Sequence, residues 1–127
     1  MPAIEFERSE PLRVFCLEDN PLLVFHLEQM IEDVGHTFAG STDSFARLKS
    51  EAPIPMDVAL VDIDLADGRT GPAAAAWLRD QGVAIGFVTG QVAIAAQYTE
   101  ISSCVLAKPF AAKDLAQVLD ELRRPAE

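Results

Sequence analysis

Three aspartates, Asp62, Asp64 and Asp67, follow a short apolar run in the stretch VALVDIDLADG. Carboxylates this close repel one another unless they are spread apart, hydrated or bound to a cation. A carboxylate at the end of a buried strand can end that strand, hold a metal ion or act as a nucleophile. The Asp-Gly pair at 67–68 is typical of a plain turn.

Other polar side chains follow apolar runs elsewhere in the chain. Glu18 and Asp19 come after LRVFCL, Thr89 ends VAIGFVT, and Lys108 follows CVLA. Each has an ordinary explanation when it is taken alone. The acids could cap a helix that begins near Pro21, the threonine could end a strand, and the lysine could belong to a loop.

The apolar runs predict five buried strands, because they lack the polar alternation of a strand with one solvated face. Segments with helical spacing of apolar residues separate them. Strands buried on both faces need helices on both sides of a parallel sheet. The sequence therefore predicts an α/β fold, a doubly wound five-stranded parallel sheet in the flavodoxin-like order 2-1-3-4-5. The expected strands cover 12–17, 36–40, 57–62, 83–89 and 104–107.

Glycine and proline mark several helix ends. Gly35 and Gly82 are expected to follow the ends of the first and third helices, and Pro72 suits a first turn. The fourth helix, QVAIAAQYTE, is predicted to be weak. It lacks a clear N-cap and carries the β-branched Val92 and Ile94, so its first turn should be marginal.

In a doubly wound sheet the functional site lies at the carboxyl ends of the strands, where the strand order reverses. The first and third strands are neighbours in the predicted order, so Glu18 and Asp19 should meet Asp62 in one shallow pocket. Thr89 and Lys108 should lie beside them. Clustered carboxylates suit a hard cation such as Mg²⁺. One carboxylate could then act as nucleophile while the metal, lysine and hydroxyl stabilise a transferring phosphoryl group.

With these residues the chain resembles the receiver (CheY-like) domain of bacterial two-component response regulators. The resemblance runs from about Leu12 to Leu122. It depends on five features in order at the strand ends: Glu18 with Asp19, then Asp62, then Thr89, and finally Lys108 with Pro109 and Phe110.

The resemblance implies a role for each acid. Asp62 would be the phosphoacceptor. Asp19, Asp62 and the backbone carbonyl of Asp64 would hold Mg²⁺, and Glu18 would act mainly through water. This implied metal set contains no nitrogen or sulfur ligand, in keeping with the preference of Mg²⁺ for oxygen.

The resemblance also implies roles for the last two strand ends. Thr89 and Lys108 would bind phosphoryl oxygens, and the Lys108–Pro109 peptide bond would be cis, which proline tolerates. The chain departs from the common receiver pattern at Val105, where Tyr or Phe is usual, and in a shorter loop after Asp62. With Gly after Thr89, the run FVTG resembles a receiver subgroup with a Phe-x-Thr-Gly signature, often found as single-domain regulators.

By resemblance, the chain is expected to be a single-domain response regulator and not an enzyme with an external substrate. A histidine kinase or phosphotransfer protein would supply the phosphoryl group, and a downstream protein target would receive the signal. The expected oligomeric state is a monomer or weak dimer.

Three alternative functions share some of these residues. DIDLA also resembles the Asp-x-Asp motif of haloacid-dehalogenase-type phosphatases, but those enzymes need an acidic pair after the lysine. A calcium-binding EF-hand loop fails because Asp67 and Ala73 stand where Gly and Glu belong. A degenerate receiver that binds partners without phosphorylation is the third alternative, and the complete set of site residues argues against it.

Composition bounds the classes of function. The chain has 127 residues, the length of one domain, and half of them are hydrophobic. Its net charge of -10 argues against direct binding to nucleic acid. No apolar run reaches the roughly 18 residues of a membrane-spanning helix, and MPAIEFERSE does not resemble a signal peptide. We therefore expect a cytoplasmic protein that does not bind membranes.

Two further expectations concern cysteines and domain limits. Cys16 and Cys104 fall on the first and fifth predicted strands. Three strand spacings separate these strands by on the order of 14 Å, beyond the reach of a disulfide. The expected organisation is an N-terminal extension (1–11) whose Ile4 and Phe6 could pack on the domain or on a partner, a receiver domain (12–122) and a C-terminal tail (123–127).

Overall fold

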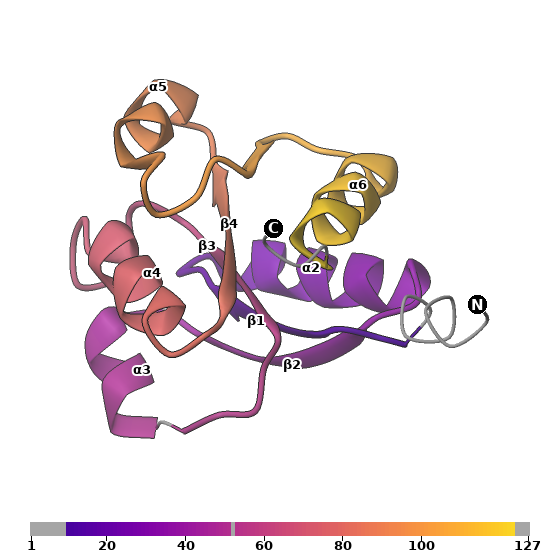
Figure 1. The fold of residues 1–127 in the computed structure, drawn as a ribbon, viewed down its shortest axis with the longest axis horizontal. Helices are drawn as coiled ribbons and strands as arrows, with labels where there is room; N and C mark the ends of the chain where they lie inside the picture. Colours follow the sequence, from indigo (N-terminus) through magenta and orange to yellow (C-terminus); the bar gives the residue numbers. More distant parts are fainter. Residues whose placement is uncertain (1–9, 52, 124–127) are drawn as a thin grey trace.

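The computed structural model describes residues 10–51 and 53–123. Within them strands and helices alternate along the chain (Figure 1). The strands are β1 (Arg13–Leu17), β2 (Thr37–Thr42), β3 (Val58–Val61), β4 (Ala84–Thr89) and β5 (Val105–Ala107). The helices are α2 (Pro21–Asp33), α3 (Phe45–Glu51), α4 (Gly71–Arg79), α5 (Val92–Ala95) and α6 (Ala112–Arg123), with a 3₁₀ turn, η1 (Ala96–Tyr98), after α5.

These strands form one sheet in the order β2-β1-β3-β4-β5, and every neighbouring pair is parallel. The predicted α/β class and strand order are confirmed. The second strand extends to Thr42, two residues beyond its predicted end, because its last residues pair with the end of β1. A shift in register between Val14 and Phe15 lies opposite Gly40, whose φ of 123° suits glycine.

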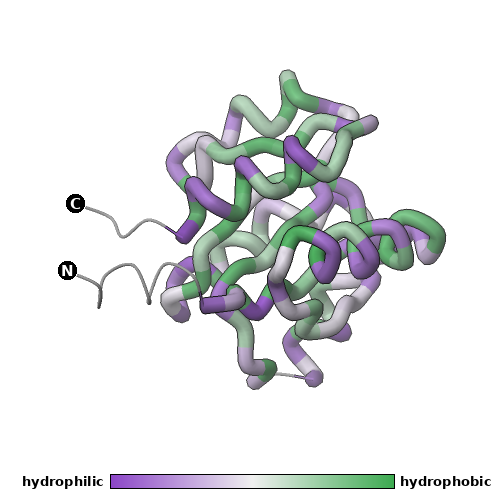
Figure 2. The backbone as a smooth tube through the Cα atoms, turned by 90° about the vertical axis from the view of Figure 1, so that its right-hand side faces the viewer, coloured by the Kyte–Doolittle hydropathy of each residue, from purple (hydrophilic) through white to green (hydrophobic). Residues whose placement is uncertain are grey.

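Helices cover both faces of the sheet, which explains why its strands are apolar throughout. Figure 1 shows α2 and α6 on one side, with α3, α4 and α5 on the other. The buried side chains form two clusters. One contains Leu27, Ile31 and Leu119 from α2 and α6, and the other contains Leu48 and Leu78 from α3 and α4. Figure 2 shows hydrophobic segments running through the middle of the molecule.

The helix ends follow local chemistry. Asn20 caps α2, because its side-chain oxygen accepts hydrogen bonds from the N–H groups of Leu22 and Leu23. The interpretation of Glu18 and Asp19 as caps is therefore wrong. Gly35 and Gly82 follow their helices with φ of 94° and 90°, as predicted.

The fourth predicted helix is short. It runs through one turn of α-helix, α5, before it tightens into η1. Gln91 stands at the N-cap and makes no side-chain capping bond. The weak start predicted from the missing cap and the two β-branched residues is confirmed.

Several expectations concern the rest of the chain. Cys16 and Cys104 are both free thiols, as predicted. Among the described residues, no helix combines the length and apolar character needed to cross a membrane. Ile4, Phe6 and most of the predicted N-terminal extension and C-terminal tail lie outside the described residues, so the predicted domain limits stay predictions.

Gly71, the first residue of α4, lies directly against the loop that follows β3. A Cβ atom added at Gly71 would lie 1.8 Å from the carbonyl oxygen of Asp62 and 2.7 Å from that of Ile63. The N–H of Gly71 also donates to the Ile63 carbonyl at 3.0 Å. Any side chain at this position would therefore force the backbone around Asp62 to move.

We expect Gly71→Ala to lower the free energy of unfolding by about 3 kcal/mol, the upper part of the range for overpacking, because the added carbon meets backbone and not a flexible side chain. Urea unfolding followed by circular dichroism measures this change. Gly90→Ala is the control, since a Cβ atom there meets nothing within 4 Å. Equal stability of the two variants would contradict the close contact.

Candidate functional site

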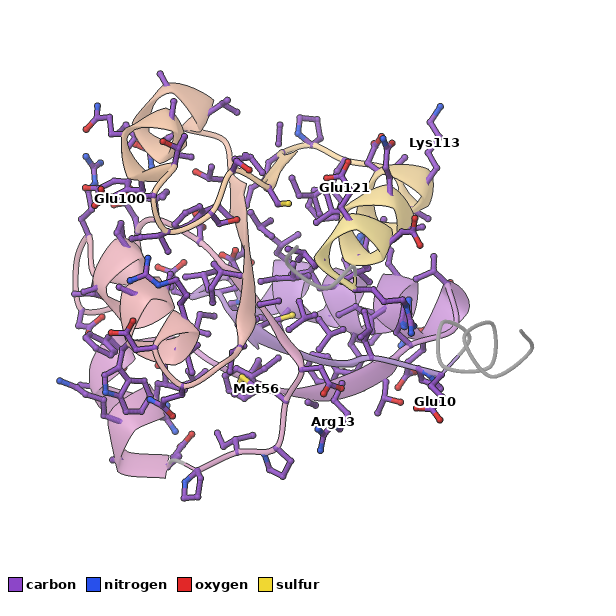
Figure 3. The ribbon with its side chains drawn as sticks, viewed as in Figure 1. Glu10, Arg13, Met56, Glu100, Lys113 and Glu121 are labelled. Atoms are coloured by element: carbon purple, nitrogen blue, oxygen red, sulfur yellow. The ribbon has the colours of Figure 1, made fainter. Side chains whose placement is uncertain are left out.

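Acidic residues extend the ends of β1 and β3, which are neighbours in the sheet. The N–H of Asp62 donates to the carbonyl oxygen of Leu17, and the N–H of Glu18 donates to that of Thr42, both at 3.0 Å. These bonds continue the sheet ladder by one residue and place both acids at the same edge. Arg13 and Met56, near the starts of β1 and β3, lie in the lower half of Figure 3, away from α5.

Glu18, Asp19 and Asp62 form an acidic cluster. Each offers a carboxylate oxygen, and these oxygens lie within 4.8 Å of one another. Glu18 and Asp62 are buried, whereas Asp19 is exposed. An all-oxygen set with one open side fits a hard cation such as Mg²⁺, which keeps several waters. The donor set therefore fits the metal that the sequence predicts.

Lys108 joins the acidic cluster from the end of β5. Its ammonium group lies 2.8 Å from an Asp62 oxygen and 3.1 Å from a Glu18 oxygen. Its backbone N–H donates to the carbonyl oxygen of Thr89 at 3.0 Å, and the Lys108–Pro109 bond is cis, as the resemblance implied. The structure thus brings together the side chains of four predicted site residues, Glu18, Asp19, Asp62 and Lys108, and joins Thr89 to them through its backbone.

Charge and burial shift the pKa values in this cluster. Burial, together with the charge of Asp62, raises the pKa of Glu18 to about 7 against the opposing effect of Lys108. Burial alone would lower the pKa of Lys108, but its bonds to Asp62 and Glu18 outweigh burial and raise it. Lys108 is therefore positively charged at neutral pH. Its single positive charge faces the three carboxyl groups of the acidic cluster.

Thr89 ends β4 and is fully buried. Its hydroxyl oxygen accepts a hydrogen bond from the N–H of Gln91 at 2.9 Å. Its backbone carbonyl is the group that binds the N–H of Lys108. Thr89 is therefore linked through its backbone to the lysine of the cluster and through its side chain to the start of α5.

Asp64 is not one of the three residues of the acidic cluster, and its carboxylate bonds to other side chains. It forms an ion pair with Arg69 at 2.9 Å and accepts a hydrogen bond from the side-chain amide of Gln91 at 2.6 Å. The bond from Arg69, followed by that from Gln91, lowers the pKa of Asp64 below its usual value. Its role as a backbone ligand for Mg²⁺ stays a prediction.

Asp67 does more than form a turn. The turn itself is present, and Gly68 has a φ of 110°. The Asp67 carboxylate also accepts hydrogen bonds from the N–H groups of Phe45 and Ala46 at the start of α3, and from the Thr70 hydroxyl at 2.6 Å. It thus helps to cap a helix distant in sequence, which sequence reasoning did not predict.

Sequence reasoning also missed Arg69 and Gln91. Neither belongs to a motif, and an arginine in a polar loop followed later by a glutamine gives no signal of mutual contact. The same holds for Gly71, although glycine directly before Pro72 at a helix start was visible.

No protein-family model matches the sequence, and no curated protein matches it. Solved structures do match. The receiver domain of the PhyR response regulator from Erythrobacter litoralis is 22% identical, with a TM-score of 0.80, over 92% of this chain and 96% of that one. The chain has the fold of a response-regulator receiver domain. The predicted resemblance is confirmed at this level.

Two further solved structures are similar to this chain. The signal receiver domain of a modulated diguanylate cyclase from Desulfovibrio desulfuricans G20 is 28% identical, with a TM-score of 0.79, over 90% of this chain and 94% of that one. The anti-anti-sigma factor PhyR from Bartonella quintana is 22% identical, with a TM-score of 0.70, over 94% of this chain but only 50% of that one.

We expect Lys108→Ala to raise the affinity of the receiver domain for Mg²⁺ by about threefold to tenfold, or about 0.7–1.4 kcal/mol, because the acidic cluster loses its paired cation. Calorimetric titration with Mg²⁺ measures this. Trp77 fluorescence is a poor reporter, since Trp77 lines a cavity with Arg13 and Met56, away from the cluster.

Lys113→Ala is the matched control for this experiment. Lys113 projects from α6 in Figure 3, away from the sheet, and is exposed. Its loss changes net charge equally without touching the cluster. A marked loss of Mg²⁺ affinity in Lys108→Ala alone would show that Lys108 supports the structure of the site rather than opposing cation binding.

Proposed function

We propose that this chain is a single-domain response regulator that accepts a phosphoryl group on Asp62. The observation that carries the proposal is the ammonium of Lys108, held between Asp62 and Glu18 at the edge where β1, β3 and β5 end. A positive side chain against a buried carboxylate can neutralise charge on phosphoryl oxygens as they approach. The receiver fold supports a signalling switch rather than a metabolic enzyme.

The chemistry assigned to Asp62 is nucleophilic. Its carboxylate oxygen attacks the phosphorus of a phosphohistidine, the P–N bond breaks, and the bonding pair stays with the imidazole nitrogen. The product is an acyl phosphate on Asp62. Water later hydrolyses it to inorganic phosphate and restores the carboxylate, so no external substrate is turned over beyond this cycle.

The other residues of the site bind and orient. Lys108 offsets the charge of the phosphoryl oxygens, and the Thr89 hydroxyl donates a hydrogen bond to one of them. Asp19, Asp62 and the backbone carbonyl of Asp64 would hold Mg²⁺, with Glu18 acting through water. When bound, the metal supplies positive charge in addition to that of Lys108.

We expect Asp62→Asn to take up no phosphoryl group from acetyl phosphate in the presence of Mg²⁺, because the amide keeps the shape of the side chain but is not a nucleophile. Intact-protein mass spectrometry measures the added phosphoryl group. Asp80→Asn, which changes an exposed aspartate beyond the end of α4, is the control and should still be labelled. Label that persists in Asp62→Asn would move the acceptor to another residue.

The same labelling experiment on the wild-type protein separates the proposed switch from a degenerate receiver. A wild-type protein that takes no label from acetyl phosphate or from any histidine kinase would favour partner binding without phosphorylation. A phosphotransfer screen against histidine kinases encoded near this gene identifies the donor. The proposal keeps the cytoplasmic setting and the monomeric or weakly dimeric state that the sequence predicts.

The protein that supplies the phosphoryl group is proposed to contact α2. Leu22 and Phe25, on the first two turns of this helix, are 76% and 58% exposed. Pro21, at the start of the same helix, lines a pocket of about 330 Å³ together with Glu18 and Asp19. Exposed apolar side chains beside a reactive site fit a protein donor, such as a histidine kinase or phosphotransfer protein.

We expect Phe25→Ala to slow phosphotransfer from the kinase found in that screen by about tenfold. The reason is that truncating an aromatic side chain that becomes buried in a protein complex typically costs more than about 1 kcal/mol of binding. Labelling by acetyl phosphate should not change, because the small donor needs no docking surface. Val92→Ala removes another exposed apolar side chain, on α5, and serves as control. Equal kinase rates for wild type and Phe25→Ala would place the docking surface elsewhere.

Output is proposed to run through a second protein. The PhyR protein of Bartonella quintana is named an anti-anti-sigma factor, and this chain matches 50% of its length. By analogy, a protein target rather than nucleic acid would read the phosphorylated state. Membership of the Phe-x-Thr-Gly subgroup is part of this proposal.

A further inference from the structure

Three side chains close a ring between the loops that follow β3 and β4. Arg69 donates to Asp64 at 2.9 Å and to the side-chain oxygen of Gln91 at 3.2 Å. The side-chain amide of Gln91 donates to the other oxygen of Asp64 at 2.6 Å. Each residue therefore contacts both of the others, and we call this group the clasp.

The other bonds of Gln91 lie within its own short segment. Its carbonyl oxygen accepts hydrogen bonds from the N–H groups of Ile94 and Ala95 at 3.0 and 3.1 Å. Gly90 precedes it, and a Cβ atom added there would meet nothing within 4 Å. The helix that follows, α5, is a single turn without a side-chain cap. Glycine loses more backbone freedom on ordering than other residues, and a one-turn helix is marginal by itself. Contacts from outside this segment should therefore add to the local order of Gln91.

That position matters because of the bond from Gln91 to Thr89. The backbone N–H of Gln91 donates to the hydroxyl oxygen of Thr89 at 2.9 Å. Among the described residues, the Thr89 hydroxyl acts only as an acceptor in this bond. Its proton is therefore available for donation to another group. Accepting one hydrogen bond polarises a hydroxyl and strengthens it as a donor.

We propose that Arg69, Asp64 and Gln91 are positioning residues, and that their clasp holds the Thr89 hydroxyl ready to donate to a phosphoryl group on Asp62. The proposal deepens the proposed function and rests on it for the phosphoryl group. The geometric part, that the clasp fixes the N–H at position 91 on Thr89, concerns the protein without any ligand.

A surface ion pair is the simpler alternative. Arg69 and Asp64 are about half exposed, and such pairs add little to stability. The clasp differs from an isolated pair because its third member, Gln91, carries the N–H that binds a fully buried hydroxyl. Its effect should therefore appear in the local order of position 91 and in phosphoryl binding, and hardly in the midpoint of unfolding.

The first measurement uses the protein without ligand. Amide hydrogen exchange at position 91, followed by NMR, should be about fivefold faster in Arg69→Ala than in wild type, the factor that corresponds to about 1 kcal/mol for one hydrogen bond. Arg79→Ala is the matched control. Arg79 also links two segments, through the carbonyl oxygen of Glu100 at 3.0 Å, but it has no part in the clasp.

The second measurement is the affinity for beryllofluoride with Mg²⁺, a mimic of the phosphoryl group on Asp62. Arg69→Ala and Gln91→Glu should each weaken it by about fivefold, as expected for one lost hydrogen bond. Glu at position 91 would place a second carboxylate against Asp64. Arg79→Ala should bind like wild type.

A charge swap tests the clasp more sharply. In the double variant Asp64→Asn with Gln91→Glu, the amide at position 64 donates to the carboxylate at position 91, and Arg69 can still donate to both. The net charge equals that of wild type. We expect the double variant to recover both slow exchange at position 91 and the affinity for beryllofluoride, whereas Gln91→Glu alone does not.

Unchanged exchange at position 91 in Arg69→Ala overturns the clasp. Faster exchange with unchanged beryllofluoride affinity also overturns it, because the clasp would then not position Thr89 for the phosphoryl group. Failure of the double variant to recover contradicts the assigned geometry. Wild-type protein that binds no beryllofluoride contradicts the proposed function, and the exchange measurement still decides whether the clasp holds position 91.

Discussion

The ammonium group of Lys108 lies between the carboxylates of Asp62 and Glu18, at 2.8 and 3.1 Å. These partners are 46 and 90 positions away in the sequence, so a parallel sheet is needed to bring them together. Two buried carboxylates at the ends of neighbouring strands repel each other unless a cation lies beside them. The strand order therefore brings the carboxylates together, and Lys108 offsets the repulsion between them.

Support for this edge is uneven. On the side of β1 and β3, Asp62 is held by a backbone bond to Leu17, and α4 begins in direct contact with its carbonyl through Gly71. On the side of β4, the connection passes through Gly90 into a single turn of helix. The phosphoacceptor candidate thus lies where β1, β3 and α4 meet, while the threonine that would sense it lies beside a short helix without a side-chain cap.

This asymmetry suits a switch without a large aromatic side chain on β5. Receivers commonly carry Tyr or Phe three positions before the lysine, whereas this chain has Val105, which is stiff at χ1 and lacks a polar tip. A change at Asp62 would then pass to α5 through Thr89 and Gln91, whose side chain is anchored by Asp64 and Arg69. Polar contacts between loops would then transmit the change at Asp62, as an aromatic side chain on the fifth strand does in other receivers.

Local patterns in the chain determined the element types, their order and the α/β class. Apolar runs without alternation required helices on both faces, Gly35 and Gly82 marked helix ends, and the missing cap before Val92 indicated a weak α5. The same rules placed Glu18, Asp62 and Lys108 at strand ends, and thereby at one edge of the sheet, because all strands run in the same direction.

What only the tertiary structure decided is which side chains touch within that edge and around it. Asn20 rather than Glu18 caps α2, Asp67 reaches across to the start of α3, and Gln91 meets Arg69. Hydrogen-bonding capacity is visible in a sequence, but partners 20 or more positions apart, such as Ala46 and Asp67 or Arg69 and Gln91, are chosen by the path of the loops. That path depends on close approaches such as Gly71 against Asp62, which arise from packing in three dimensions and leave no periodic trace in the chain.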